Sequence, residues 1–132
     1  MTPTQRTMDE LRKRGYTVGR VEQWRPGPNG GFRQDLFGII DLLAISGDLT
    51  IGVQVCGTAW SAHVKKLLGR DPEYPEAEQA VRRWLESPHR HLELWGWRPL
   101  KRNGRKVATL RRAMFYVRYP GAPIEVEEFT EP

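Results

Sequence analysis

Two apolar, β-rich runs joined by a tight turn are the most constraining feature of this sequence, residues 37–56 (FGIIDLLAISGDLTIGVQVC). Gly47 and Asp48 suit a two-residue turn, so the pattern predicts two paired antiparallel strands. A turn centred between them places Asp41 directly opposite Gln54 on one face of the hairpin. This pairing requires a reason, because a buried carboxylate without a partner shifts its pKa, pairs with another group or binds a metal.

The flanking segments predict an α/β fold in which helices flank a mixed β-sheet. A helix is expected over residues 3–14, since Thr2 and Pro3 suit its start and Gly15 its end. Residues 17–24 (TVGRVEQW) predict a strand, and RPGPNGG predicts a loop. Apolar residues at helical spacing predict two further helices within 58–69 and 75–88, and strands follow at 91–97 and 111–119.

The length of 132 residues predicts one domain, over residues 1–120, followed by a loose acidic tail over 121–132. The single cysteine, Cys56, excludes an internal disulfide framework and a cysteine-based zinc cluster. The N-terminus is polar and contains acids, unlike a signal or transit peptide. We therefore expect a reducing, cytoplasmic location.

Positive charge is concentrated in one segment of the chain. Between Arg98 and Arg118 there are eight Arg or Lys residues and no acid, within a net charge of +5. Such a segment favours contact with a polyanion such as DNA. A solvated, arginine-rich hairpin without a partner is the alternative interpretation.

Asp41 and the side-chain oxygen of Gln54 together offer hard oxygen ligands of the kind that Mg²⁺ prefers. A magnesium ion at this position can hold a phosphate and lower the pKa of an attacking water. Two alternatives stay open at this point, since Asp41 also suits a structural carboxylate and Gln54 a hydrogen-bonding residue of the sheet.

Residues 3–68 resemble the PD-(D/E)XK nuclease superfamily, most of all the archaeal-type Holliday junction resolvases and related phage proteins. The resemblance rests on Gly15-Tyr16 after the first helix, the strand TVGRVEQW, the loop RPGPNGG, and the thirteen-residue spacing of Asp41 and Gln54. It implies a restriction-endonuclease-like αβββαβ core, hydrolysis of DNA with Mg²⁺ or substituting Mn²⁺, four-way junctions as substrate, and a homodimer. It also implies that Val55 lends its carbonyl to the metal.

Two positions depart from the pattern of that family. Cys56 stands where the family has a lysine, and the first helix has no acid at Thr4 or Gln5. For the lysine, a turn of about 100° per residue places Lys65 beside the apolar stripe of its helix and Lys66 nearly opposite the core. Lys65 is therefore the predicted substitute.

There are two candidates for the missing acid. Glu22 lies on the strand that leads to the loop, and Asp35 precedes the predicted strand that carries Asp41. The predicted catalytic residues are Glu22, Asp41, Gln54 and Lys65. The predicted metal ligands are Asp41, Gln54, Val55, Glu22 and Asp35. The predicted DNA-binding residues are Arg33, Lys66, Lys101, Arg102, Arg105 and Lys106. A nicking or other structure-dependent nuclease, and a catalytically decayed DNA-binding protein on the same fold, are the alternative functions.

Overall fold

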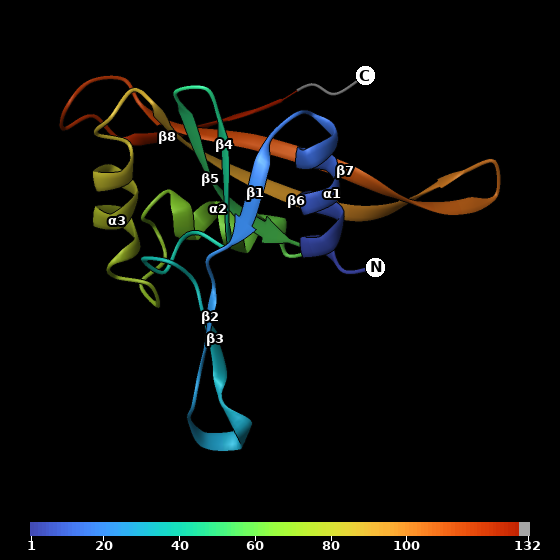
Figure 1. The fold of residues 1–132 in the computed structure, drawn as a ribbon. Coiled ribbons are helices and arrows are strands. Elements are labelled where there is room, and N and C mark those ends of the chain that lie inside the picture. The colour runs from blue at the N-terminus through green and yellow to red at the C-terminus, as the bar shows by residue number, and fades with distance from the viewer. Residues whose placement is uncertain (130–132) are drawn as a thin grey trace.

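A mixed six-stranded sheet with three α-helices forms the body of the protein in the computed structural model, which describes residues 1–129 (Figure 1). The strand order is β1-β4-β5-β6-β7-β8; only β5 and β6 run parallel, and all other neighbours are antiparallel. The six strands are β1 (Thr17–Arg20), β4 (Leu42–Ser46), β5 (Leu49–Cys56), β6 (Arg90–Arg102), β7 (Arg105–Val117) and β8 (Ile124–Glu128). The α/β class and the mixed sheet are confirmed.

The helices divide between the two faces of the sheet. Helix α1 (Pro3–Lys13) buries Met8 and Leu11 against one face, beside Trp95 of β6. Helices α2 (Trp60–Leu67) and α3 (Ala77–Trp84) cover the other face and bury Leu67 and Val81. The sheet is therefore buried on both faces, as in other α/β proteins.

The central hairpin has the register that the sequence predicts. Leu42 pairs with Val53, and the ladder continues without a bulge to the pairing of Ser46 with Leu49. Gly47 has φ +58° in the turn, a conformation that glycine adopts without steric cost. Asp41 and Gln54 consequently meet at the open end of this hairpin.

The first helix also begins as predicted, because the Thr2 side chain accepts a hydrogen bond from the Gln5 N–H at 3.1 Å. The strand predicted over 17–24 is wrong in its length. Strand β1 ends at Arg20, and the Val21 N–H donates to the Asp41 carbonyl at 3.0 Å before the chain leaves the sheet.

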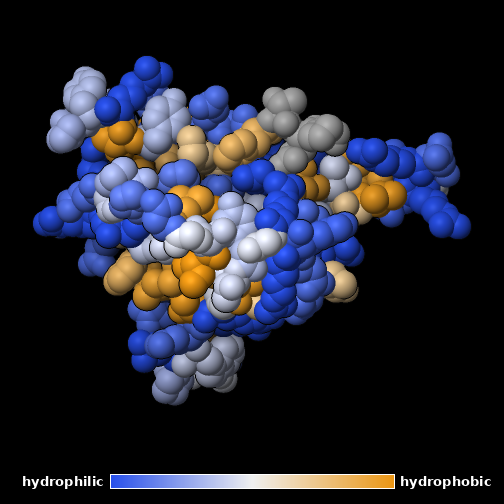
Figure 2. All heavy atoms as spheres, turned by 45° about the horizontal axis from the view of Figure 1, so that its top comes forward, coloured by the Kyte–Doolittle hydropathy of each residue, from blue (hydrophilic) through white to orange (hydrophobic). Residues whose placement is uncertain are grey.

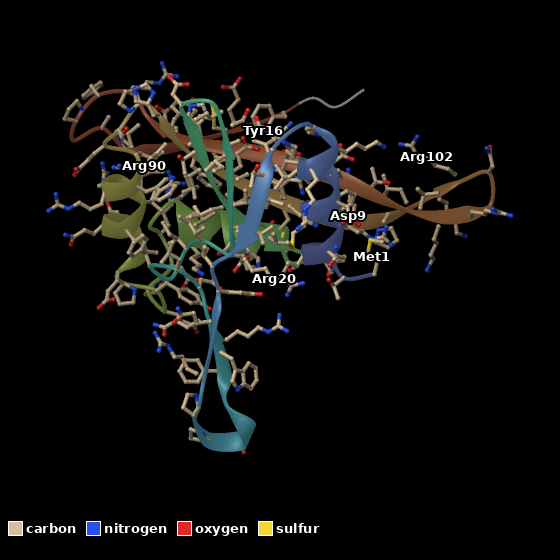
Figure 3. The ribbon with its side chains drawn as sticks, viewed as in Figure 1. Met1, Asp9, Tyr16, Arg20, Arg90 and Arg102 are labelled. Atoms are coloured by element: carbon tan, nitrogen blue, oxygen red, sulfur yellow. The ribbon has the colours of Figure 1, made fainter. Side chains whose placement is uncertain are left out.

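Residues 23–34 form a separate hairpin that projects from the body (Figure 1), and we call it the arm. It consists of β2 (Gln23–Arg25), β3 (Phe32–Gln34) and a single 3-10 turn at Pro28–Gly30 between them. The sequence RPGPNGG, predicted to be a loop, forms the tip of this arm. Figure 3 labels Arg20 where β1 leaves the sheet above it.

Strands β6 and β7 extend well beyond the predicted strands and form a ribbon that projects from the side of the sheet (Figure 1). Asn103 and Gly104 have φ +51° and +78° in its two-residue turn. The end of the ribbon is mostly hydrophilic (Figure 2), and Arg102 lies along it (Figure 3).

The loose tail predicted over 121–132 is wrong for most of its length. Residues 124–128 form β8, which pairs with β7 and buries Ile124. Its acids meet bases of β7, as in the ion pair of Glu128 with Arg111. Pairing with β7 and these ion pairs hold the segment as the edge strand of the sheet. Residues 130–132 of the predicted tail lie outside the described residues. Within the described part, no helix is long and apolar enough to cross a membrane.

Candidate metal centre

Three carboxylates converge at the open end of the β4–β5 hairpin, and we call them the carboxylate cluster. Glu22, Asp35 and Asp41 each offer an oxygen, and these atoms all lie within 4.8 Å of one another. Asp41 precedes β4, Glu22 precedes the arm, and Asp35 follows it. The chain thus places three acids together because three segments leave or enter the sheet at one point.

Asp41 is held in place by the end of the β-ladder. Its N–H donates to the Val53 carbonyl at 2.9 Å, and its carboxylate accepts from the Val55 N–H at 2.8 Å. The carboxylate therefore satisfies the Val55 N–H at the point where the β4–β5 ladder ends. Its exposed fraction is 7%, so the group is nearly dehydrated.

Gln54 links the acids to a lysine. Its amide nitrogen donates to Asp41 at 2.9 Å and to Asp35 at 3.0 Å, and its oxygen accepts from the Lys66 ammonium at 3.1 Å. Because the oxygen faces Lys66, Gln54 bridges the other groups here, and the predicted ligation by Gln54 would require its amide to turn over.

The helix-face argument that favoured Lys65 is wrong in its geometry. Lys66 is 9% exposed, and its ammonium lies 3.6 Å from an Asp35 oxygen and 4.8 Å from the centre of the Tyr74 ring. Lys65 is exposed and lines a separate hollow with Arg111. Lys66 lies on the side of α2 that faces the end of β5. Its apolar stem is buried, and its ammonium reaches Gln54 and the acids.

The remaining predicted residues divide into two groups. Glu22 has a side chain 13% exposed and pairs with the exposed Arg33 at 3.3 Å, so both lie at the cluster. The other four predicted DNA-binding residues belong to the ribbon outside the cluster: Lys101, Arg102, Arg105 and Lys106. Cys56, where the sequence resemblance calls for a lysine, is buried beside Trp60, and burial raises the pKa of its thiol to about 11.

The two aspartates are electrostatically unlike. Burial raises the pKa of Asp41 to about 8, and a hydrogen bond with Asp35 and the charge of Asp35 add to the effect. Burial also acts to raise the pKa of Asp35, but hydrogen bonds from Asp41 and Gln54 and the charge of Lys66 outweigh it and hold that pKa below its ordinary value. Without a metal, the pair is arranged to share one proton, carried by Asp41.

This donor set fits a hard divalent cation. Carboxylate oxygens are the ligands that Mg²⁺ and Mn²⁺ prefer, and a cation can replace the proton that the aspartate pair otherwise holds. In an extended strand the N–H and C=O of one residue point to the same side, so the Val55 carbonyl also lies toward Asp41. Asp41, Asp35, Glu22 and Val55 are therefore the residues that could hold the ion.

Sequence reasoning missed two neighbours of this group. Tyr74 lies in the connection between α2 and α3, where no periodic pattern marks it, and its ring covers the Lys66 ammonium. His63 is half-buried, and burial followed by the Lys66 charge lowers its pKa. Its Nδ1 has no hydrogen-bond partner among the described residues. Its spacing of three residues from Lys66 was the available signal.

Comparisons with known proteins add no relative to this description. No family model, no curated protein and no solved structure matches the chain.

Proposed function

We propose that this protein is a metal-dependent endonuclease that hydrolyses phosphodiester bonds in DNA, with four-way junctions as its preferred substrate. The observation that carries the proposal is the carboxylate cluster with the Lys66 ammonium beside it, at the open end of the central hairpin. Three acids can hold a divalent ion that assists attack on a phosphate, and a lysine beside them can neutralise charge that develops there. The resemblance over residues 3–68 supports the same chemistry.

The charge balance of the site supports a divalent ion. Asp35 pairs with Lys66 and Glu22 pairs with Arg33, whereas Asp41 is held by neutral donors from Gln54 and the Val55 backbone. Asp41, Asp35 and Glu22, with the Val55 carbonyl, would hold Mg²⁺ or Mn²⁺. When bound, such an ion supplies Lewis acidity toward a phosphate oxygen and lowers the pKa of a bound water.

Lys66 and Gln54 are the residues that would act on the reacting groups around the ion. The Lys66 ammonium points at the acids, where it can orient a water or bind a phosphate oxygen. The hydrogen bonds from Lys66 to Gln54 and from Gln54 to both aspartates fix these groups relative to one another. In this proposal Lys66 of helix α2 takes the role of the lysine that the resemblance places at position 56. The presence of such a lysine favours an active enzyme over a decayed one.

DNA as substrate rests on one arginine beside the cluster and on the basic ribbon away from it. Arg33 stands at the cluster itself, and the ribbon carries Lys101, Arg102, Arg105 and Lys106, all exposed. Such side chains bind backbone phosphates without reading bases. A four-way junction has two equivalent strands to cut, so a two-fold homodimer is part of the proposal.

The test uses an immobile four-way junction labelled on each strand, together with a flap and a linear duplex of the same sequence. We expect the wild type to cut the junction symmetrically with Mg²⁺ and not with EDTA, and an Asp41→Ala variant to bind it without cutting. Cleavage of flaps and junctions at equal rates would favour a general structure-dependent nuclease. Binding without cleavage by the wild type, in Mg²⁺ and in Mn²⁺, would favour the decayed, DNA-binding alternative.

A further inference from the structure

The arm carries two large aromatic side chains that are exposed to solvent. Trp24 of β2 and Phe32 of β3 are 62% and 52% exposed, although the hydrophobic effect favours burying such rings. Residues 23–34 (QWRPGPNGGFRQ) contain two arginines and no acid. An exposed element of this composition is suited to a partner that is both anionic and aromatic.

Each face of the arm presents one ring and one arginine. Cross-strand partners share a face of a hairpin, and the register pairs Trp24 with Arg33 and Arg25 with Phe32. The Trp24 ring lies so close to Gly31 that a Cβ there would meet its Nε1 at 2.9 Å. Phe32 similarly lies over Gly27, where a Cβ would approach its ring to 3.3 Å. Glycines thus allow both rings to lie against the arm's own backbone.

The two ends of the arm lie at the carboxylate cluster. Glu22 immediately precedes it and Asp35 immediately follows it, so two of the three acids form its base. Arg33 reaches back from the arm to Glu22 at 3.3 Å. A strand bound at the cluster would therefore run beside the arm and its rings.

We propose that the arm is a base-stacking wedge, in which Trp24 and Phe32 stack on bases at a branch point of DNA while Arg25 and Arg33 contact the adjoining phosphates. This inference rests on the proposed function for its substrate class, DNA. Aromatic side chains beside arginines bind exposed bases in a sequence-tolerant way. A linear duplex keeps its bases stacked inside the helix, so the wedge discriminates in favour of branched DNA.

The experiment measures binding in EDTA, so that it does not depend on cleavage. The probes are a four-way junction with 2-aminopurine at the branch point and a linear duplex with 2-aminopurine at its centre. The variants are Trp24→Ala, Phe32→Ala and the double substitution, and Tyr119→Ala is the matched control, since Tyr119 is 65% exposed outside the arm. The rings lie outside the core, and circular dichroism confirms folding for each variant.

We expect the wild type and Tyr119→Ala to change the fluorescence of the junction probe. The double variant should lose this change and bind the junction about tenfold more weakly, which is the typical effect of removing a stacked ring. Its affinity for the duplex should stay within about twofold, and Trp24→Phe should retain most of the junction signal. Unchanged junction affinity and fluorescence in the double variant would overturn the wedge.

The two proposals fail in different ways. A wild type that cuts DNA with Mg²⁺ while the double variant keeps its junction signal would leave the nuclease standing and remove the wedge. A wild type that shows the ring-dependent signal and cuts nothing would leave the wedge standing and remove the nuclease. A wild type that binds neither DNA would overturn both.

Discussion

Two acidic side chains of the described residues are buried at this sheet, Glu93 within β6 and Asp41 just before β4, and their surroundings differ. Glu93 of β6 is 3% exposed; its Oε1 accepts from the Trp95 indole at 2.9 Å and from the Arg112 guanidinium at 2.9 Å. Asp41 is 7% exposed and faces a second carboxylate, Asp35. The first acid has a cation of its own, and the second has none in ion-pair contact among the described residues.

This difference separates a structural carboxylate from a candidate functional one. A buried ion pair with additional hydrogen bonds is electrostatically complete, and removing either partner leaves an uncompensated charge. Two neighbouring carboxylates repel each other until one of them takes up a proton or both bind a cation. The fold therefore compensates Glu93 internally, whereas Asp41 takes up a proton or a cation from solution.

The largest expected effect concerns activity and separates the two acids most sharply. Asp41→Asn should lower the rate of junction cleavage at least about a thousandfold, because several kcal/mol of metal-supplied stabilisation disappear with the ligand. Its metal-free stability should not fall, since Asn has nearly the shape of the protonated, neutral Asp41 that it replaces. Single-turnover cleavage and urea unfolding measure the two quantities. Full activity of this variant would show that the cluster is structural, like Glu93.

The converse substitution should affect stability instead. Glu93→Gln is expected to lower the free energy of unfolding by about 3 kcal/mol, because the Trp95 indole and the Arg112 guanidinium both lose the buried carboxylate to which they donate. Cleavage per folded molecule should persist. Urea denaturation gives the first value, and activity at a temperature where the variant is folded gives the second. A variant as stable as wild type would contradict the structural role of Glu93.

The two neighbouring lysines sharpen the comparison within the site. Lys66→Ala should slow cleavage about a hundredfold, the usual range for a positioned group that assists proton transfer or charge neutralisation. Lys65→Ala, the matched control, should change the rate by less than about twofold because its side chain is exposed away from the acids. The reverse ranking in single-turnover assays would restore Lys65 as the active lysine.

The smallest effect is a pH dependence of stability without metal. The pKa of Asp41, about 8 in the folded protein, exceeds its ordinary value of 3.8, so the folded state holds a proton that the unfolded chain has released. Stability should fall between about pH 4 and pH 8 and then level off. The lowered pKa of Asp35 acts in the opposite sense, through stability that is lost only as pH falls below its ordinary value of 3.8.

Urea unfolding in EDTA at pH 5 and pH 8 measures this slope, and Asp41→Asn serves as the control with a flatter profile. Adding Mg²⁺ at pH 8 should restore stability to the wild type, because a cation then replaces the proton. Equal slopes for the two proteins would mean that Asp41 ionises normally.

The local patterns of the sequence predict the central hairpin well. The Gly47-Asp48 turn fixes the register, and the register brings Asp41 to Gln54, because one slipped residue would move every side chain to the other face. The start of α1 follows equally well from its cap. These features depend on neighbours along the chain, which a sequence displays directly.

Features set by distant contacts were predicted less well. The division of residues 17–24 depends on the Val21 N–H meeting the Asp41 carbonyl, and the β8 strand depends on pairing with β7. The choice between Lys65 and Lys66 depends on which side of α2 faces β5. The helical periodicity of about 100° per residue did not predict that orientation correctly. Glu22 was named as a residue of the strand before the loop and Asp35 as a residue before the Asp41 strand, and the fold brings both to Asp41.

The most direct test of the central claim is a titration of Mn²⁺ followed by electron paramagnetic resonance, on wild type, Asp41→Asn and Glu93→Gln at pH 8. We expect the wild type and Glu93→Gln to take up Mn²⁺ at the carboxylate cluster, with Mg²⁺ as a competitor, and Asp41→Asn to lose this binding. Equal Mn²⁺ uptake by wild type and Asp41→Asn would contradict a metal centre at these carboxylates.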